Sequence, residues 1–91
     1  MIRKKENKTD YYQMGVNYLF GLNGYKINKS KAYSLFNKGV KNEDYDCMYG
    51  LYLMFKNGQY VQSDMEVALM WLHKAGDGSD LAKQELFDLQ D

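Results

Sequence analysis

Large apolar side chains recur three and four positions apart in two stretches of the chain, first at Val16 and Phe20 and later at Leu51, Met54 and Phe55. This spacing places the side chains of each stretch on one face of an α-helix. The chain also contains no proline, is rich in strong helix formers and has few β-branched residues. We therefore expect an all-α protein.

Polar capping residues and glycines divide this pattern into five predicted helices. Thr9 is the predicted N-cap of the first helix, and Asn23-Gly24 is its predicted stop. The segment Ser63-Asp-Met-Glu66 predicts a capping box at the start of the fourth helix. The predicted helices span about residues 10–22, 29–41 and 42–57, a fourth from 63 to 76 or 78, and a fifth from 79 almost to 91.

The first two predicted helices resemble the next two. Gly15 corresponds to Gly50 at an offset of 35, and Ala32 corresponds to Ala68 at an offset of 36. A repeat of this period is typical of helical hairpins that bury their apolar faces by stacking on a neighbour. We expect one domain, residues 1–91, built of a basic tail at 1–8, repeats at about 10–43 and 44–78, and a fifth helix at about 79–91.

The two glycines lie in the middle of predicted helices, where glycine costs about 1 kcal/mol relative to alanine. Such a cost is explained when a second helix must approach closely at that point. We expect Ala32 and Ala68 to form the opposite sides of these two close crossings.

The segment Gly15-Val-Asn-Tyr18-Leu-Phe-Gly21, with the later Lys31-Ala32 and Asn37-Lys38-Gly39, resembles the Sel-one-like repeat, a relative of the tetratricopeptide repeat. A second copy contains Gly50, Asn57-Gly58, Asp64-Met-Glu-Val-Ala68, Trp71 and Lys74-Ala75-Gly76. The resemblance covers about residues 10–91. It implies a short right-handed α-solenoid of two helical hairpins with a C-terminal capping helix.

The second copy departs from the repeat at Leu53, where the family usually has tyrosine, and at Lys56, where it has glycine. Residues 79–91 correspond to the first helix of a third repeat. In this interpretation Phe87 takes the place of Gly15 and Gly50, and its ring would block a further helix.

In tetratricopeptide-like solenoids the first helices of the hairpins line the concave side. By this resemblance the concave side here is apolar, and its residues would merge into one strip. The strip is either a groove for a partner or part of the core, and the sequence leaves both readings open. The predicted partner-binding residues are Tyr12, Val16, Leu19, Phe20, Leu51, Met54 and Phe55, with Cys47 beside them.

Composition adds little chemistry to this picture. The chain is 45% hydrophobic and 26% charged, and it has no apolar stretch near the ~18 residues of a membrane span. The single cysteine and the absence of a secretory signal favour a cytoplasmic location. Cys47 and His73 have no companions at the spacing of a metal site or a nucleophilic pair. We therefore predict no catalytic residue, no cofactor and no metal.

Charge is segregated along the chain. Residues 1–41 contain nine Lys or Arg against two acidic residues, and residues 42–91 contain three Lys against ten acidic residues. Such asymmetry could promote head-to-tail self-association or nucleic-acid binding by the basic half, or simply reflect solvated helix faces. The basic side chains are Arg3, Lys4, Lys5, Lys8, Lys26, Lys29, Lys31, Lys38 and Lys41, with Tyr11, Tyr12 and Tyr25 available for stacking.

These observations predict a non-enzymatic protein–protein interaction module, an adaptor or a small inhibitor, that binds a partner protein through the concave apolar groove. The alternative is nucleic-acid binding through the basic N-terminal half. A single arginine and the acidic second half count against that alternative.

Overall fold

The computed structural model describes residues 9–90, and these contain five helices and no strand. The helices are α1 (Tyr11–Phe20), α2 (Lys29–Lys41), α3 (Tyr45–Asn57), α4 (Met65–Ala75) and α5 (Asp80–Leu89). The prediction of an all-α protein is therefore confirmed. The basic tail predicted at residues 1–8 lies outside the described residues.

Aspartates begin two of the helices for which a hydroxyl residue was expected. Asp10 and Asp64 each accept a hydrogen bond from the backbone N–H three residues ahead, at 3.0 and 3.1 Å. The predicted caps Thr9 and Ser63 are therefore wrong by one residue each. A carboxylate is favoured because its charge lies at the positive end of the helix dipole. Ser63 instead donates its hydroxyl hydrogen to the carbonyl oxygen of Lys56, across the loop.

Helices α1 and α3 both end at a glycine in the left-handed conformation. Gly21 has a φ of 68° and Gly58 a φ of 64°, and each N–H donates to the carbonyl oxygen four residues earlier. Residues with a Cβ rarely adopt this conformation, so glycine sets the helix end. Because Gly21 already stops α1 after Phe20, the helix is two residues shorter than predicted from Asn23-Gly24.

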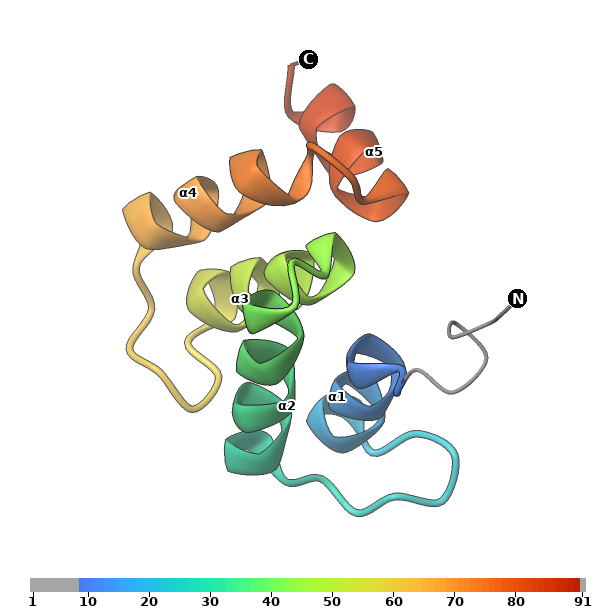
Figure 1. Cartoon of the computed structure of the whole chain (residues 1–91). Coiled ribbons are helices and arrows are strands. Elements are labelled where there is room, and N and C mark those ends of the chain that lie inside the picture. The colour runs from blue at the N-terminus through green and yellow to red at the C-terminus, as the bar shows by residue number, and fades with distance from the viewer. Residues whose placement is uncertain (1–8, 91) are drawn as a thin grey trace, which may run out of the picture.

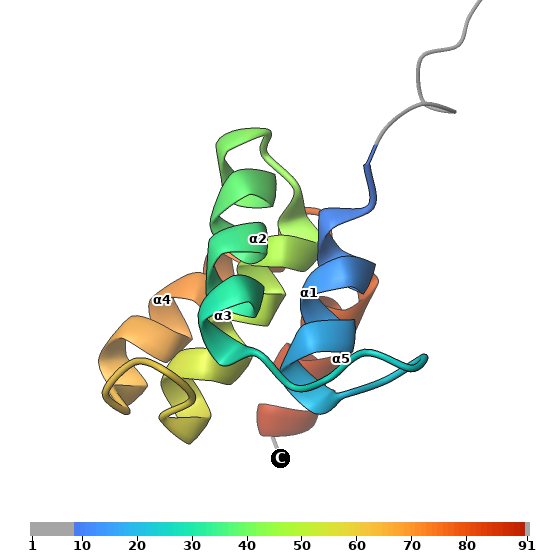
Figure 2. The same ribbon diagram turned by 90° about the horizontal axis from the view of Figure 1, so that it is seen from below.

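The helices stack in chain order as two hairpins and a fifth helix. Helices α1 and α2 pack together, as do α3 and α4, and α3 contacts all four other helices. The first helices of successive hairpins, α1, α3 and α5, contact one another in sequence (Figure 1). Viewed from below, the first hairpin lies in front of α5 (Figure 2). This arrangement is consistent with a short solenoid.

Two clusters of buried side chains form the core. The first joins the two hairpins and consists of Leu19, Ala32, Phe36, Cys47, Leu51 and Met54. The second joins α3, α4 and α5 and consists of Tyr52, Ala68, Leu72, Ala75 and Ala82. Helix α3 contributes to both clusters, which explains why it is central to the fold.

The two mid-helix glycines face the same aromatic ring. A Cβ added to Gly15 or Gly50 would collide with the ring of Phe36, and at Gly50 the distance to Cε1 would be 2.6 Å. The predicted close approach is thus confirmed, but its partner is not. The atoms nearest to both glycines belong to Phe36 rather than to Ala32 or Ala68, although both alanines are fully buried. Phe36 therefore packs between α1 and α3.

The predicted position of Phe87 is wrong. Gly50 is six residues after the N-cap Asp44, and the residue six after the N-cap Ser79 is Glu85. Phe87 lies two residues further along, and its side chain is 66% exposed. It therefore does not occupy the position of the glycines.

Candidate functional site

Three of the seven predicted partner-binding residues belong to the core. Leu19, Leu51 and Met54 are at most 3% exposed and pack in the first cluster, together with the fully buried Cys47. Side chains packed at the density of a protein interior present no surface to a partner. The sequence left open whether the strip is a groove or part of the core. These three residues lie in the core.

Phe55 lies on another side of α3. It is half-buried and packs against the second cluster. Phe55 is seven residues after Met48 and three after Tyr52, so these side chains form one helical stripe. All three contact the cluster shared with α4 and α5. The structure therefore does not form the single strip expected to join Phe55 with Val16 and Phe20.

The remaining three predicted residues lie on α1. Tyr12 and Val16 are half-buried against the first cluster, and Phe20 is 47% exposed. The ring centroid of Tyr12 lies 6.1 Å from that of Phe36. These three side chains keep apolar surface that is open to solvent.

A second stripe of half-exposed residues lies on α3, and the sequence interpretation missed it. Tyr49, Leu53 and Lys56 are spaced by four and three residues, which places them on one helix face. Tyr49 and Leu53 are half-buried and, like Phe55, pack against the second cluster, and Lys56 is exposed. The spacing of these residues in the sequence could have revealed this stripe. Together we call Tyr12, Val16, Phe20, Tyr49 and Leu53 the α1–α3 face.

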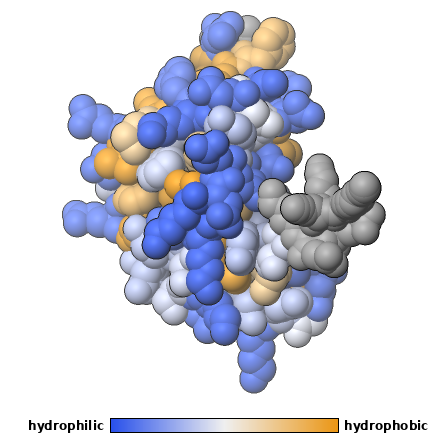
Figure 3. Space-filling model, viewed as in Figure 1, coloured by the Kyte–Doolittle hydropathy of each residue, from blue (hydrophilic) through white to orange (hydrophobic). Residues whose placement is uncertain are grey.

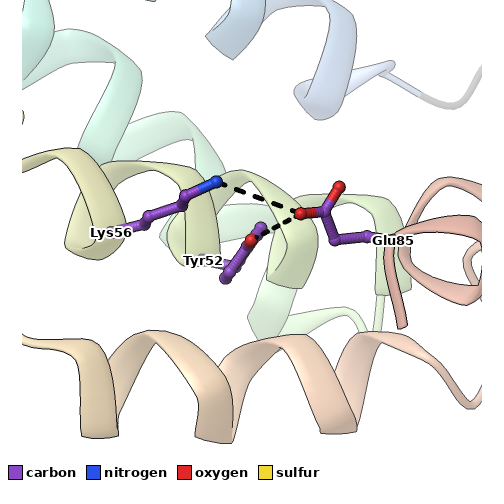
Figure 4. A network of polar contacts seen from close by, with 3 residues as sticks. All are labelled: Tyr52, Lys56 and Glu85. Atoms are coloured by element: carbon purple, nitrogen blue, oxygen red, sulfur yellow. Dashed lines mark hydrogen bonds and ion pairs between the residues drawn. The ribbon is translucent and has the colours of Figure 1, made fainter. Parts of the chain in front are cut away.

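A polar network at the edge of this face connects α3 to α5. The Tyr52 hydroxyl donates a hydrogen bond to the Glu85 carboxylate at 2.8 Å, and the Lys56 ammonium lies 4.0 Å from the same oxygen (Figure 4). The Lys56 ammonium also lies 5.6 Å from the centroid of the Tyr52 ring. Because α5 fully buries only Ala82, this network contributes directly to holding α5 in place.

Acidic groups surround the tyrosines of the α1–α3 face. Burial raises the pKa of Tyr12 to about 12, and the nearby Tyr49, Asp46 and Asp10 contribute. Burial also raises the pKa of Tyr49, and the charge of Glu85 adds to this effect. Both hydroxyls therefore remain protonated at neutral pH and are available as hydrogen-bond donors.

We expect the fold to lose stability as the pH rises above 10, the ordinary pKa of tyrosine. The unfolded chain then releases the Tyr12 proton while the folded chain retains it until about pH 12. This difference favours unfolding over that interval and has no effect below it. Tyr52 acts in the same direction, because burial and the hydrogen bond to Glu85 raise its pKa.

Urea unfolding of the wild type and of Tyr12→Phe and Tyr52→Phe, followed between pH ~8 and ~12, measures this effect. Each variant should show a smaller loss of stability with pH than the wild type. Equal slopes in all three proteins would contradict the assignment.

A separate shallow cleft of about 430 Å³ lies where α2, α3 and α4 meet. Its lining combines carboxylates with a lysine, and the Lys74 ammonium lies 5.7 Å from the centroid of the Trp71 ring. The lining side chains are Val40, Glu43, Tyr45, Met48, Trp71, Lys74 and Asp77. The cleft contains no histidine or cysteine, so its side chains do not form a nucleophile with a base.

Cys47 and His73 do not form a nucleophile and its base. Cys47 is fully buried, and burial, followed by the charge and hydrogen bond of Asp44, raises the pKa of its thiol well above the ordinary value. It therefore remains a thiol rather than a nucleophilic thiolate. His73 lies on the exposed side of α4. Within residues 9–90, no three His, Cys, Asp or Glu side chains are grouped as a metal site requires.

Two of the three tyrosines proposed for nucleic-acid stacking, Tyr12 and Tyr25, pack against other aromatic rings of the chain. The Tyr18 and Tyr25 rings pack edge to face with centroids 4.9 Å apart, and the Lys31 ammonium lies 5.6 Å from the Tyr18 centroid. Tyr11 is half-buried. Arg3, Lys4, Lys5 and Lys8 of the predicted basic surface lie outside the described residues.

None of the helices in the described part of the chain combines the length and apolar character needed to cross a membrane. Comparisons with curated proteins and with solved structures gave no significant match. The Sel1 repeat family matches the chain twice, at residues 10–44 and 46–80. The first match spans α1 and α2, and the second spans most of α3 and all of α4. These two matches cover more than half of the sequence, and the chain therefore belongs to the Sel1 repeat family.

Proposed function

We propose that this protein is an interaction module that binds an apolar segment of a partner protein on the α1–α3 face. The observation that carries the proposal is the row of half-exposed apolar and tyrosine side chains on the first helices of two successive repeats. Exposed apolar surface of this kind, bordered by polar groups, is typical of interaction sites.

Family membership supports the general class of function. Sel1 repeats generally mediate protein–protein interactions and are not catalytic. The finer role depends on the partner. The module acts as an adaptor if it joins two proteins, and as an inhibitor if it covers a working surface of one.

The composition of the face suggests the chemistry of the partner. Tyrosine gives rigid contact area with a polar end, which suits it to interfaces. The charges of Asp10 and Asp46 lie close enough to Tyr12 to affect its pKa, and Glu85 does the same for Tyr49. A partner segment with apolar side chains and an adjacent lysine or arginine would complement both features.

Replacing Phe20 with alanine tests this proposal. Peptides selected from a random display library on the immobilised 91-residue chain serve as probes, and their dissociation constants are measured for wild type and variants. We expect Phe20→Ala to weaken binding at least ~30-fold, because an aromatic anchor at an interface contributes ~2 kcal/mol or more. Since Phe20 is 47% exposed, its loss should leave the thermal melt close to that of the wild type.

Met70→Ala is the matched control. Met70 is 46% exposed and lies on α4, outside the α1–α3 face, so its loss should leave binding unchanged. The selected peptides should also be enriched in apolar residues with a neighbouring lysine or arginine. Equal effects of the two substitutions, or peptides bound by Met70 rather than Phe20, would contradict the proposed location of the site.

A further inference from the structure

The outer face of α5 exposes large apolar side chains. One of them, Phe87, lies at the helix position that Tyr52 occupies in α3, where the side chain is covered. Tyr52 is eight residues after the N-cap Asp44, and α4 covers it so that only 2% remains exposed. Phe87 is eight residues after the N-cap Ser79, yet it is 66% exposed. Leu81, on the same helix, is 45% exposed.

Acidic residues lie between these apolar side chains. Asp80 and Phe87 are seven residues apart, as are Leu81 and Asp88, and Gln84 lies between the two pairs on the helix surface. The Gln84 side chain donates a hydrogen bond to the Asp88 carboxylate at 3.0 Å, which orders this part of the helix. We call these five residues the α5 surface. It is apolar and negatively charged.

The loop that joins α1 to α2 carries the opposite charge. Leu22, Tyr25 and Ile27 are 43%, 37% and 59% exposed, and Lys26 and Lys29 are exposed beside them. We call these five residues the loop surface. It is apolar and positively charged, with Lys29 at the start of α2, and no other connection in residues 9–90 contains three exposed large apolar residues.

Internal hydrogen bonds hold this loop in one conformation. The Asn17 side chain, 6% exposed, accepts hydrogen bonds from the side chains of Gln13 and Asn23 at 3.0 and 2.8 Å. At the loop's far end the Asn28 N–H donates to the Tyr18 carbonyl oxygen at 2.8 Å. Because the loop is already ordered, binding through it would cost little conformational entropy.

The two surfaces lie at opposite ends of the molecule. Figure 1 shows the loop between α1 and α2 at the bottom and α5 at the top, and the longest dimension of the molecule is 42 Å. Figure 2 agrees, because the loop lies in front and α5 behind. In the space-filling view, apolar atoms are visible at the α5 end among hydrophilic ones (Figure 3). A contact between the two surfaces within one molecule is therefore excluded.

We propose that the α5 surface of one copy binds the loop surface of a second copy, in a head-to-tail assembly. Apolar residues at the centre of each surface would be buried, and the lysines of one copy would face the aspartates of the other. Such an interface is heterologous, so each added copy leaves one free surface of each kind and the assembly grows as a chain or closes as a ring. The interface is small, and its charged part should weaken as salt rises.

Two complementary variants test this arrangement. The α5 variant carries Phe87→Ser and Asp88→Lys, and the loop variant carries Ile27→Ser and Lys26→Glu. Sedimentation velocity is recorded from ~10 µM to ~1 mM protein, where weak interfaces associate, at low and high salt. The wild type should form larger species as concentration rises, and less so at high salt, whereas each variant alone should remain monomeric.

The decisive measurement is the equimolar mixture of the two variants. The loop variant keeps an intact α5 surface and the α5 variant an intact loop surface, so the mixture should form a 1:1 dimer that does not grow further. A symmetric contact through α5 alone would instead let the loop variant dimerise by itself, and mixing it with the α5 variant would add no new species. That result, or a wild type that stays monomeric throughout, would overturn the proposal.

Two controls separate this proposal from instability and from the partner-binding site. Asp88→Lys alone reverses a charge without altering an apolar contact, and it should reduce association while leaving the circular dichroism melt unchanged. Phe20→Ala, which alters the α1–α3 face, should associate like the wild type. If Phe20→Ala abolished assembly and the α5 variant did not, the self-association surface would be the α1–α3 face and the proposal would be wrong.

Discussion

Replacing Gly15 or Gly50 with leucine is expected to lower the free energy of unfolding by ~3 kcal/mol or more, the upper range for overpacking a core. Both glycines contact the ring of Phe36, which is fully buried and surrounded by other core residues. At Gly50 even a Cβ would come within 2.6 Å of the ring, so a larger side chain can be accommodated only if α3 moves away from α2. The total stability of a chain of this length is about 5–14 kcal/mol.

Urea and thermal unfolding of the two variants measure this effect, and Ser34→Leu is the control. Ser34 lies on the exposed face of α2, where leucine has the higher helix propensity and the change should be neutral or slightly stabilising. Gly50→Ala should also lower stability, because its Cβ overlaps the ring. Adding Phe36→Leu to Gly50→Ala should restore part of that loss, because the smaller side chain relieves the overlap. Unchanged melts for both glycine variants would refute the proposed role of the ring.

The repeat and the helices could be predicted from the sequence because they depend on local signals. Gly58 is followed by no competing stop, so the end of α3 was found, whereas Gly21 and Asn23-Gly24 offered two stops for α1. Thr9 and Asp10 likewise offered two N-caps in adjacent positions. The choice between such neighbours depends on a small energy difference, which the sequence pattern alone does not resolve.

The rotation of α3 about its axis was the main feature that the sequence interpretation missed. Gly50 faces Phe36, so residues one and four positions later, Leu51 and Met54, share its buried side. Residues on the other side of Gly50, including Tyr49 and Leu53, remain half-exposed. A glycine at a close helix crossing thus marks the buried face, and this information was already present in the sequence.

The position of α5 depends on contacts between residues that are far apart in the chain. Tyr52 and Glu85 are 33 residues apart, and no repeat pattern pairs them, since Glu85 stands where the earlier repeat has Gly50. In the same register Phe87 corresponds to the buried Tyr52, and it is exposed because no described helix covers it as α4 covers Tyr52. Counting from the N-caps Asp44 and Ser79 places Glu85, and not Phe87, at the position of Gly50.

Phe36→Ala is expected to have the largest effect of any single truncation, about 3–5 kcal/mol, the range for removing a buried phenylalanine. The ring is 0% exposed and fills the space between Gly15 and Gly50, which have no side chains with which to close the cavity. Because α1 and α3 both rest on this ring, its loss should weaken the contact between the two hairpins as well as the packing of the first.

Leu72→Ala provides the comparison within the second repeat. Leu72 follows Phe36 at the repeat offset of 36, is also 0% exposed, and packs with Tyr52 and Ala68. Its truncation should cost about 2–5 kcal/mol. Native-state hydrogen exchange distinguishes the two variants, because Phe36→Ala should reduce amide protection in α1, α2 and α3, and Leu72→Ala mainly in α4 and α5. If Phe36→Ala reduced protection in α2 alone, the ring would not join the two repeats, and their stacking would have to depend on other contacts of α3.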